Sequence, residues 1–389
     1  MPLQSVTWTP RRLSAVRSRF PPTAPAPVPP SSDSAPGATS DDATADEASS
    51  DDASPPKATI YDVASRSGTS VATVSRVMND ADNVAEETRE RVEAAIQELS
   101  YRPDRTARTL AEQQTRMIAV ALPSFITPFH NELMKGIRLS LRGRNVDLLV
   151  RDLGSEDPNA ELAHFLDQGT VDGLLVAGAI VDEAAADELR AWRAPAVLIG
   201  DERDGLDSFT WDDHAGARAA TAHLIEQGHE RIGLIRTRNE MPLQERRIEG
   251  YRAVLEEAGL PFDASLVVSG QTSKHAGFSE EAGREAMRQL LMADPPVTAV
   301  FCSSDVHAIG AWSALHEAGK SIPEDLALVG YDDVKTSRFL GLSSVSQGMH
   351  EVGERAVQRL MYRMAHPDDP ERVAERMTPV LQARRSSKR

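Results

Sequence analysis

The chain has 389 residues and a net charge of −16, with a pI of about 5.1. This length allows two or three domains, and the acidic balance disfavours bulk attraction to nucleic acid or to a membrane surface. Cys302 is the single cysteine, so no disulfide can form within the chain, and a reducing cytoplasm is expected. The histidines form no HExxH or Cys/His pairing, so we expect no metal site and no cofactor. No apolar run is long enough for a bilayer, and the N-terminus lacks the apolar core of an export signal, so we expect no membrane partner.

Residues 1–56 are rich in Pro, Ser, Ala and Asp, and they include the stretch PPTAPAPVPP. Seven acidic residues and no basic residue lie between Asp33 and Asp52. This composition is typical of a disordered arm, because it offers little apolar surface to bury. Three interpretations stay open: a solvated tail, a chain start assigned too early, or an autoinhibitory segment whose charge imitates that of DNA.

Residues 57–103 are predicted to form three short helices. The first begins at T-I-Y-D, a capping box in which Asp62 stands in for the usual Glu. Gly68 and Thr69 break this helix, and Ser70 can cap the second. The apolar stripes that would join the helices are Ile60, Val63 and Ala64, then Val71, Val74, Val77 and Met78, and then Val92, Ala95, Ile96 and Leu99. Two helices joined by a tight turn and followed by a third predict a helix-turn-helix unit.

The second helix, SVATVSRVMN, has an unusual polar face. It carries small hydroxyl and amide side chains and one arginine, where a helix that is merely solvated would carry Glu and Lys. Small donors suit contacts with the phosphate backbone, and an arginine suits bidentate contact with guanine in the major groove. Candidate phosphate contacts are therefore Ser70, Thr73, Ser75 and Asn79, and the candidate base reader is Arg76. The alternative is a helix whose small residues serve packing only.

The segment YRPDRTARTLA, residues 101–111, follows the three helices and holds three arginines. Arg105 and Arg108 lie one turn apart if the segment is helical, and Leu110 is then placed as an apolar wedge between base steps in the minor groove. Residues 104–116 are therefore predicted to form a short helix followed by a linker. The alternative is an ordinary interdomain linker.

From Met117 onward, apolar runs of strand length alternate with helical stretches. The runs are MIAVAL, VDLLV, GLLVAG, AVLIG, RIGLI, LVVS, TAVFC and LALVGY. This alternation is typical of βαβ units and of parallel sheets covered by helices on both faces. About eight strands exceed what one small open sheet needs. We therefore predict an α/β domain over 117–389 made of two doubly wound subdomains with a cleft between them.

Four stretches carry a resemblance to one known family: ATIYDVASRSGTSVATVSRVMN, VAEETRERVEAAIQELSYRPDRTARTL, RIEGYRAVLEEAGL and IPEDLALVGYDD. In these stretches, and from about Ala58 to about Ser387, the chain resembles the lactose-repressor (LacI) family of bacterial transcription regulators. The resemblance implies an all-α helix-turn-helix headpiece and an α/β effector domain similar to a periplasmic sugar-binding protein. It places one effector subdomain at 117–212 and 346–371 and the other at 213–345 and 372–389.

The resemblance also implies which residues meet DNA. The base-reading positions are matched by Val71, Ala72 and Arg76, and the phosphate-contacting positions by Thr59, Ser70, Thr73, Ser75, Asn79 and Thr88. Residues 104–111 match the hinge helix in the minor groove, with Arg105, Thr106, Ala107 and Arg108 and the intercalating Leu110. Two positions depart from the family. Ala85 replaces the serine that usually caps the third helix, which should cost some local stability, and Ala111 replaces a basic residue, so one phosphate contact is expected to be missing.

Ligands of such folds bind where the carboxyl ends of the strands face the cleft. By resemblance the lining includes Phe129, His130, Asp201, Arg247, Thr272, Ser304 and Asp332. Arg247 and Asp332 together would supply the donors and acceptors that a sugar or other polyol needs, and the alternative is a structural salt bridge across the cleft. Thr272, Ser304 and Gly348 depart from common family residues, which weakens the case for a standard hexose site.

The resemblance therefore implies a repressor that binds a palindromic operator as a homodimer in the cytoplasm, controlled by a small ligand, expected to be a carbohydrate. No leucine heptad follows Leu381, so we expect no tetramer. An enzyme is not expected: ALHEAGKS resembles a relaxed nucleotide loop, but it closes a helix instead of opening one. A solute receptor without a DNA role is a second rival, disfavoured by the headpiece and by the missing export signal.

Overall fold

The computed structural model describes residues 58–78, 81, 83–102, 115–124, 126–154, 157–169, 171–238, 241–272 and 277–388. The acidic arm and the predicted hinge helix lie outside these residues, so both stay predictions. Within the described ranges, no helix has the length and apolar character needed to cross a membrane. The same residues contain no cluster of His, Cys, Asp and Glu suited to a metal ion.

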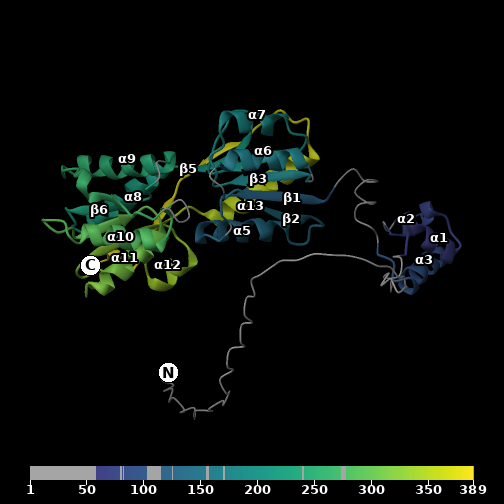
Figure 1. Cartoon of the computed structure of the whole chain (residues 1–389), viewed down its shortest axis with the longest axis horizontal. Coiled ribbons are helices and arrows are strands. Elements are labelled where there is room, and N and C mark those ends of the chain that lie inside the picture. Colours follow the sequence, from purple (N-terminus) through teal and green to yellow (C-terminus); the bar gives the residue numbers. More distant parts are fainter. Residues whose placement is uncertain are drawn as a thin grey trace, which may run out of the picture. The chain divides into compact units, whose positions relative to one another are not determined.

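The headpiece consists of α1 (Ile60–Ser67), α2 (Val71–Met78) and α3 (Glu86–Glu98) (Figure 1). The predicted capping box begins α1: the backbone N of Thr59 donates to Asp62 Oδ2 at 2.8 Å, and the backbone N of Asp62 donates to Thr59 Oγ1 at 3.4 Å. α1 ends at Gly68, whose φ of 66° is left-handed and therefore favours glycine. No side chain caps α3 at Ala85, as expected. The headpiece core contains buried residues from all three helices: Val63, Ala64, Val74, Val77, Val92 and Ala95.

The first effector sheet has six parallel strands in the order β11-β5-β4-β3-β1-β2. Helices α5 (Pro128–Leu141) and α13 (Met349–Ala365) cover one face, and α6 (Pro158–Gln168) and α7 (Glu183–Ala191) cover the other (Figure 1). Alternate residues of a strand point to opposite faces, so each strand feeds both cores. The strands are β1 (Met117–Leu122), β2 (Asp147–Asp152), β3 (Gly173–Ala177), β4 (Ala196–Ile199), β5 (Asp207–Trp211) and β11 (Ala374–Met377).

The second sheet has the order β12-β10-β9-β8-β6-β7, and only β12 runs antiparallel to its neighbour. Helices α8 (Asp213–Glu226) and α9 (Pro242–Glu257) pack on one face, and α10 (Glu280–Leu290) and α11 (Asp305–Glu317) on the other. The short α12 (Lys335–Leu340) follows β9. The strands are β6 (Ile232–Arg236), β7 (Val267–Ser269), β8 (Ala299–Cys302), β9 (Ala327–Asp332), β10 (Ser343–Ser346) and β12 (Val380–Gln382).

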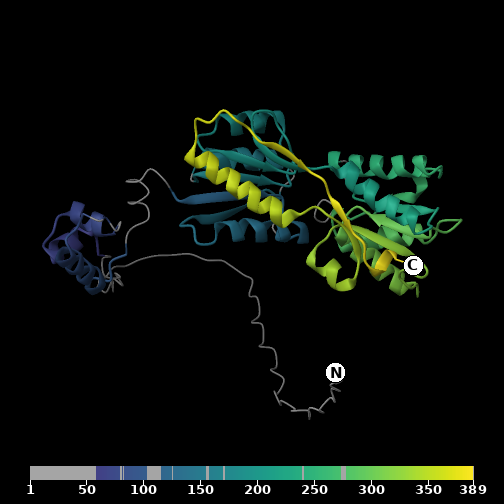
Figure 2. The same cartoon turned by 180° about the vertical axis from the view of Figure 1, so that it is seen from behind.

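The chain passes between the two subdomains three times: from β5 to α8, from β10 to α13, and from β11 to β12 (Figure 2). The boundary predicted between residues 371 and 372 was wrong. β11 pairs with β5 in the first sheet, and Val373 and Met377 pack against that sheet's core. The third passage therefore lies between Met377 and Val380.

The prediction of two doubly wound subdomains is confirmed, and all eight predicted runs contain strands. Four further strands, β5, β10, β11 and β12, were not predicted. They are three to five residues long and largely polar, as in SSVS and AERM. β5 and β10 are largely buried, whereas β11 and β12 are partly exposed edge strands, and strands this short carry little periodic signal.

Candidate functional site

α2 buries one face in the headpiece core and exposes the other. Val74 and Val77 are buried, whereas Ala72 and Arg76 are exposed. Val71, the third predicted base reader, is half-buried and packs against the headpiece core. The exposed face of α2 is therefore carried mainly by Ala72 and Arg76.

The hydroxyl groups predicted to contact phosphate also stabilise the helix starts. Ser70 Oγ accepts a hydrogen bond from the backbone N of Thr73 at 3.1 Å and lies 2.9 Å from Thr73 Oγ1. The Thr59 hydroxyl donates to Asp62 Oδ2 at 2.8 Å. Ser75 and Thr88 are half-buried. The other predicted DNA contacts lie outside the described residues: Asn79, Arg105, Thr106, Ala107, Arg108 and Leu110.

Arg76 differs from two headpiece arginines, Arg66 and Arg89, whose guanidinium groups are engaged. Arg66 forms an ion pair with Glu98 at 2.6 Å, and Arg89 Nη2 donates to the carbonyl of Ala81 at 3.0 Å. Across the described residues, no carboxylate is paired with Arg76. An exposed, uncommitted guanidinium on the free face of α2 can make two parallel hydrogen bonds with a guanine edge.

In the first effector subdomain, two of the predicted cleft residues, Phe129 and His130, lie at the start of α5. The Phe129 ring lies 5.8 Å from that of Trp211 in an edge-to-face arrangement, and Trp211 Nε1 donates to the backbone oxygen of Gln347 at 2.6 Å. His130 is buried; its Nδ1 lies 2.7 Å from Thr127 Oγ1, while its Nε2 has no partner. Burial lowers the pKa of His130 to about 4, so the imidazole is neutral at physiological pH.

In the second subdomain, Arg247 is buried in α9 and most of its donors are engaged. Its Nε donates to Asp213 Oδ1 at 2.8 Å, its Nη2 lies 2.7 Å from the same oxygen, and its Nη1 donates to the carbonyl of Ser303. The guanidinium carbon also lies 3.7 Å from the centroid of the Tyr331 ring. The carboxylate that pairs with Arg247 is thus Asp213, at the start of α8.

The sequence suggests Asp332 as the carboxylate that works with Arg247. Instead Gln347 lies between them: in the amide orientation that satisfies both neighbours, its oxygen accepts from Arg247 Nη2 at 3.2 Å and its nitrogen donates to Asp332 Oδ1 at 3.1 Å. Burial raises the pKa of Asp332 well above its ordinary value, while Arg247 acts in the opposite direction. Gln347 belongs to the second passage between the subdomains, so this contact joins the site to a hinge segment.

The remaining predicted cleft residues have local structural roles. Asp201 accepts backbone hydrogen bonds from Val181 at 2.8 Å and Glu202 at 2.9 Å, and it pairs with Arg203 at 3.2 Å. Ser304 is buried and caps α11, with its Oγ 3.3 Å from the backbone N of His307. Thr272 is half-buried.

Three site residues were missed from the sequence: Asp213, Gln244 and Gln347. Asp213 follows Asp212 directly after β5, and Asp212 is used to cap α8, accepting from the backbone N of Ala215 at 2.8 Å. Spacing alone could not decide which of the two acids would meet Arg247. Gln244, one turn before Arg247, is fully buried.

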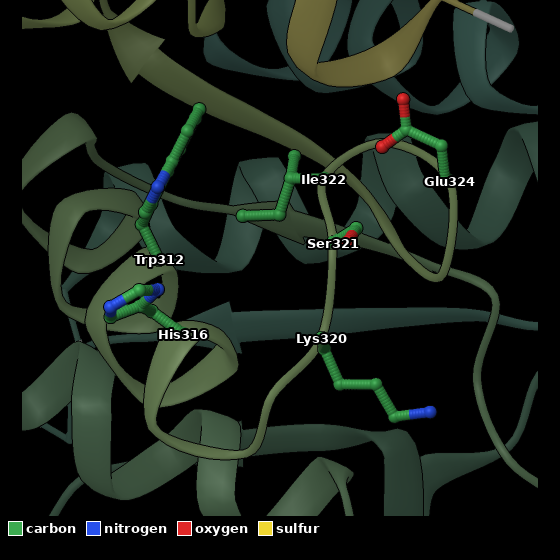
Figure 3. Close-up of a pocket in the computed structure, with 6 residues that line it drawn as sticks. All are labelled: Trp312, His316, Lys320, Ser321, Ile322 and Glu324. Carbon is green, nitrogen blue, oxygen red and sulfur yellow. The ribbon is translucent and has the colours of Figure 1, made fainter.

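Two hollows are found on the described residues, and the second of them includes the site residue Gln347. One, of about 330 Å³, lies between the last turns of α11 and the loop into β9, with Trp312, His316 and Lys320 among its lining residues (Figure 3). Lys320 belongs to the ALHEAGKS stretch, which closes α11, and Gly319 follows with a φ of 68°. The stretch therefore lacks the strand-to-helix context of a phosphate loop. The other hollow, of about 510 Å³, lies along the second and third passages and includes Gln347, Arg355 and Glu375 in its lining.

Comparison with known protein families gives two matches. Residues 59–104 match the model described as bacterial regulatory proteins of the lacI family. Residues 221–387 match the model of a periplasmic binding protein-like domain.

Individual relatives agree with these matches. The HTH-type transcriptional repressor CytR of Escherichia coli strain K12 is 34% identical over 314 residues, which cover 79% of this chain and 90% of that protein. A structure titled as a complex of the transcriptional regulator CelR with cellobiose is 31% identical, with a TM-score of 0.62, and the match covers 85% of this chain and 99% of the other. The lac repressor dimer bound to operator and the anti-inducer ONPF is 26% identical, with a TM-score of 0.73, over 86% of this chain and 100% of the other.

Proposed function

Because the chain belongs to the lacI family of bacterial regulatory proteins, and is thus a DNA-binding transcription repressor, we propose that it acts as a homodimer on a palindromic operator under the control of a small polar ligand. The observation that carries this proposal is the free face of α2, where Arg76 is exposed and no described carboxylate neutralises it. A buried arginine or a paired one would have to break existing bonds before it could read a base.

For DNA reading, we propose that α2 enters the major groove, with Arg76 and Ala72 facing base edges and Val71 at the margin. Thr59, Ser70, Thr73, Ser75, Asn79 and Thr88 would contact phosphates. Residues 104–111, with Arg105, Thr106, Ala107 and Arg108, would form a hinge helix in the minor groove, where Leu110 would insert between adjacent base pairs at the operator centre.

For assembly, a two-fold operator calls for a two-fold protein, because one headpiece offers few base contacts. The relative solved as a lac repressor dimer on its operator supports this choice. Sedimentation as a stable monomer at micromolar concentration would contradict the dimer.

For control, we propose that a sugar or related polyol binds at the carboxyl edges of the two effector sheets. Its contacts would come from Phe129, His130, Arg247 and Asp332, with Asp201, Thr272 and Ser304 nearer the rim. The relative solved with cellobiose supports a hydroxyl-rich ligand. Ligand binding alters operator affinity only if it favours one arrangement of the subdomains. The protein would act in the cytoplasm, where its operator lies, and without catalysis.

The experiment that tests the function is selection of operator sequences from random palindromic DNA by the full-length protein, followed by gel shift. We expect a palindromic consensus, bound much more tightly than unrelated DNA of the same length and with an affinity that falls steeply with salt. Failure to enrich any sequence would contradict the proposal.

A further inference from the structure

Gln244 lies in the first turn of α9, the helix that follows β6, at the carboxyl edge of the second sheet. Its side chain is 0% exposed, yet neither Oε1 nor Nε2 has a hydrogen-bond partner. Among the side chains of the described residues, it is the one that leaves two buried polar atoms unpaired. Buried amides are almost always hydrogen-bonded, so this one requires an explanation.

The polar groups at the same edge cannot complete this amide without losing bonds of their own. Arg247 is held by Asp213, Ser303 and Gln347. His307 Nε2 lies 2.7 Å from the carbonyl of Gly277. Because neither atom of the Gln244 amide is paired with a described residue, the amide is available to a ligand or to an internal water molecule.

The first subdomain has a matching unpaired group. His130, at the start of α5, is 8% exposed, and its Nε2 is buried without a partner. Phe129 beside it is half-buried and offers an aromatic surface. Incomplete polar groups thus occur at the carboxyl edges of both sheets, where open α/β folds bind their ligands.

The chemistry of these groups favours an uncharged ligand. The charge of Arg247 is already compensated by Asp213 at 2.7 Å. The pKa of His130, lowered by burial to about 4, keeps that ring neutral. A glutamine amide presents one donor and one acceptor in a single plane, which is the pattern by which Gln and Asn recognise the edge of a nucleobase, and bases stack well on aromatic side chains.

We propose that Gln244 sets the specificity of the effector site, and that the effector is an uncharged nucleoside-like molecule: a polyol joined to a planar ring whose edge pairs with the Gln244 amide. The proposal rests on the effector-controlled function above and narrows its ligand class.

The test is calorimetric titration of the full-length protein with adenosine, guanosine, cytidine, uridine, D-ribose and cellobiose. At least one nucleoside should bind at least about tenfold more tightly than ribose or cellobiose, because only a base edge offers the amide a coplanar donor and acceptor. Gln244→Leu, close in volume, should weaken that nucleoside at least about tenfold. Gln168→Leu, an exposed position on α6, should not. Gln244→Asn, which keeps an amide but draws it back, should also weaken binding.

Three outcomes would overturn the proposal: no nucleoside binding at millimolar concentration, tighter binding of ribose or cellobiose than of any nucleoside, or unchanged nucleoside affinity in both Gln244 variants. Unchanged affinity together with a higher unfolding temperature for Gln244→Leu would identify the amide as the site of an internal water. Gel shifts on the selected operator distinguish failure of the nucleoside proposal from failure of the proposed function. A protein that binds operator but ignores nucleosides loses only this proposal, whereas one that binds no operator loses the function as well.

Discussion

The headpiece and the effector domain each place one arginine at the predicted site, and they hold it in opposite ways. Arg76 is exposed on α2, and no described acid pairs with it. Arg247 is 4% exposed and is bound by a carboxylate, a carbonyl and an aromatic ring. On a DNA-binding surface, the hydrogen-bond donors of an arginine can stay bound to water until DNA replaces that water. Inside the protein, the donors of a buried arginine must be hydrogen-bonded by other protein groups even without a ligand.

The comparison shows where a sequence motif gives the chemistry directly. On the headpiece, Arg76 is both the residue that the motif predicts and the side chain that is free to contact DNA. In the cleft, the motif residue Arg247 belongs to a network, and the groups still without partners are Gln244 and His130. Mutations should therefore have different effects on the two regions: on stability in the cleft and on recognition in the headpiece.

The largest effect is expected from Asp213→Ala. It leaves the buried Arg247 without its counterion, which should lower the free energy of unfolding by about 3–5 kcal/mol. Urea unfolding followed by tryptophan fluorescence measures this. Glu257→Ala removes the exposed partner of Arg218 and should lower the free energy of unfolding far less, because water screens this pair. Equal losses of unfolding free energy in the two variants would contradict the expectation that the buried Asp213–Arg247 pair contributes more to stability than the exposed pair.

The second effect concerns pH. His130 stays neutral in the folded protein down to about pH 4, whereas in the unfolded chain it takes up a proton below about pH 6.5. The unfolded state therefore binds more protons between these values, and the folded protein loses stability as pH falls through that window. The contribution is about 1.4 kcal/mol per pH unit.

His130→Phe should remove this contribution, so the difference in unfolding free energy between the two proteins should change with pH from about 6.5 to about 4. Urea unfolding at several pH values measures it. The buried Asp305, whose pKa burial raises to about 7, has an opposite effect on stability, but it is present in both proteins and cancels in the difference. His164→Phe, at an exposed position whose ring bonds Gln168, should keep the wild-type slope. Parallel curves for His130→Phe and wild type would show that His130 is not held neutral.

Arg76→Ala comes third. It should cost about 1–3 kcal/mol at one G·C pair in each half-site and relax the preference there, because a bidentate contact is lost. Gel shifts on operators with single substitutions measure this. Ser75→Ala should instead weaken binding to all sequences alike. If Arg76→Ala weakens every operator equally, the arginine contacts phosphate and not a base.

The smallest effect is expected at the start of α3. Ala85→Ser should supply the missing cap and stabilise the helix by about 1 kcal/mol. Amide hydrogen exchange along α3 should slow by about fivefold, since about 1.4 kcal/mol corresponds to a factor of ten. Glu93→Ser, exposed in the middle of α3, should not slow exchange. Unchanged exchange in Ala85→Ser would show that solvent already satisfies the first turn.

Local rules predicted the headpiece well, because its signals are short-range. The Thr59–Asp62 capping box, the Gly68 stop and the Ser70 cap all appear in the structure. The effector strands with apolar runs were also predicted. β10 and β11 were not, because SSVS and AERM are short and mostly polar, and β11 pairs with β5, which is far away in sequence.

The cleft was predictable only to a limited extent. Motif matching identified Arg247 and Asp332, yet it could not show that Asp213 binds the arginine or that Gln347 separates the two. Those contacts depend on how the subdomains are threaded, since residues 213, 247 and 347 come from three separate elements or connections. Hydrophobic periodicity describes one helix or strand at a time, so it carries no information on contacts between side chains of different elements.

The threading of the two sheets also determines the order in which a growing chain can fold. The headpiece is contiguous and complete once α3 and Tyr101 have been made. Neither effector sheet is complete at that stage or for long afterwards: the first waits for β11, which begins at Ala374, and the second for β12, which is made later still. On the ribosome, the DNA-reading unit is therefore expected to emerge and fold while the effector sheets still lack edge strands. A premature stop before residue 374 would release a folded headpiece joined to two unfinished sheets.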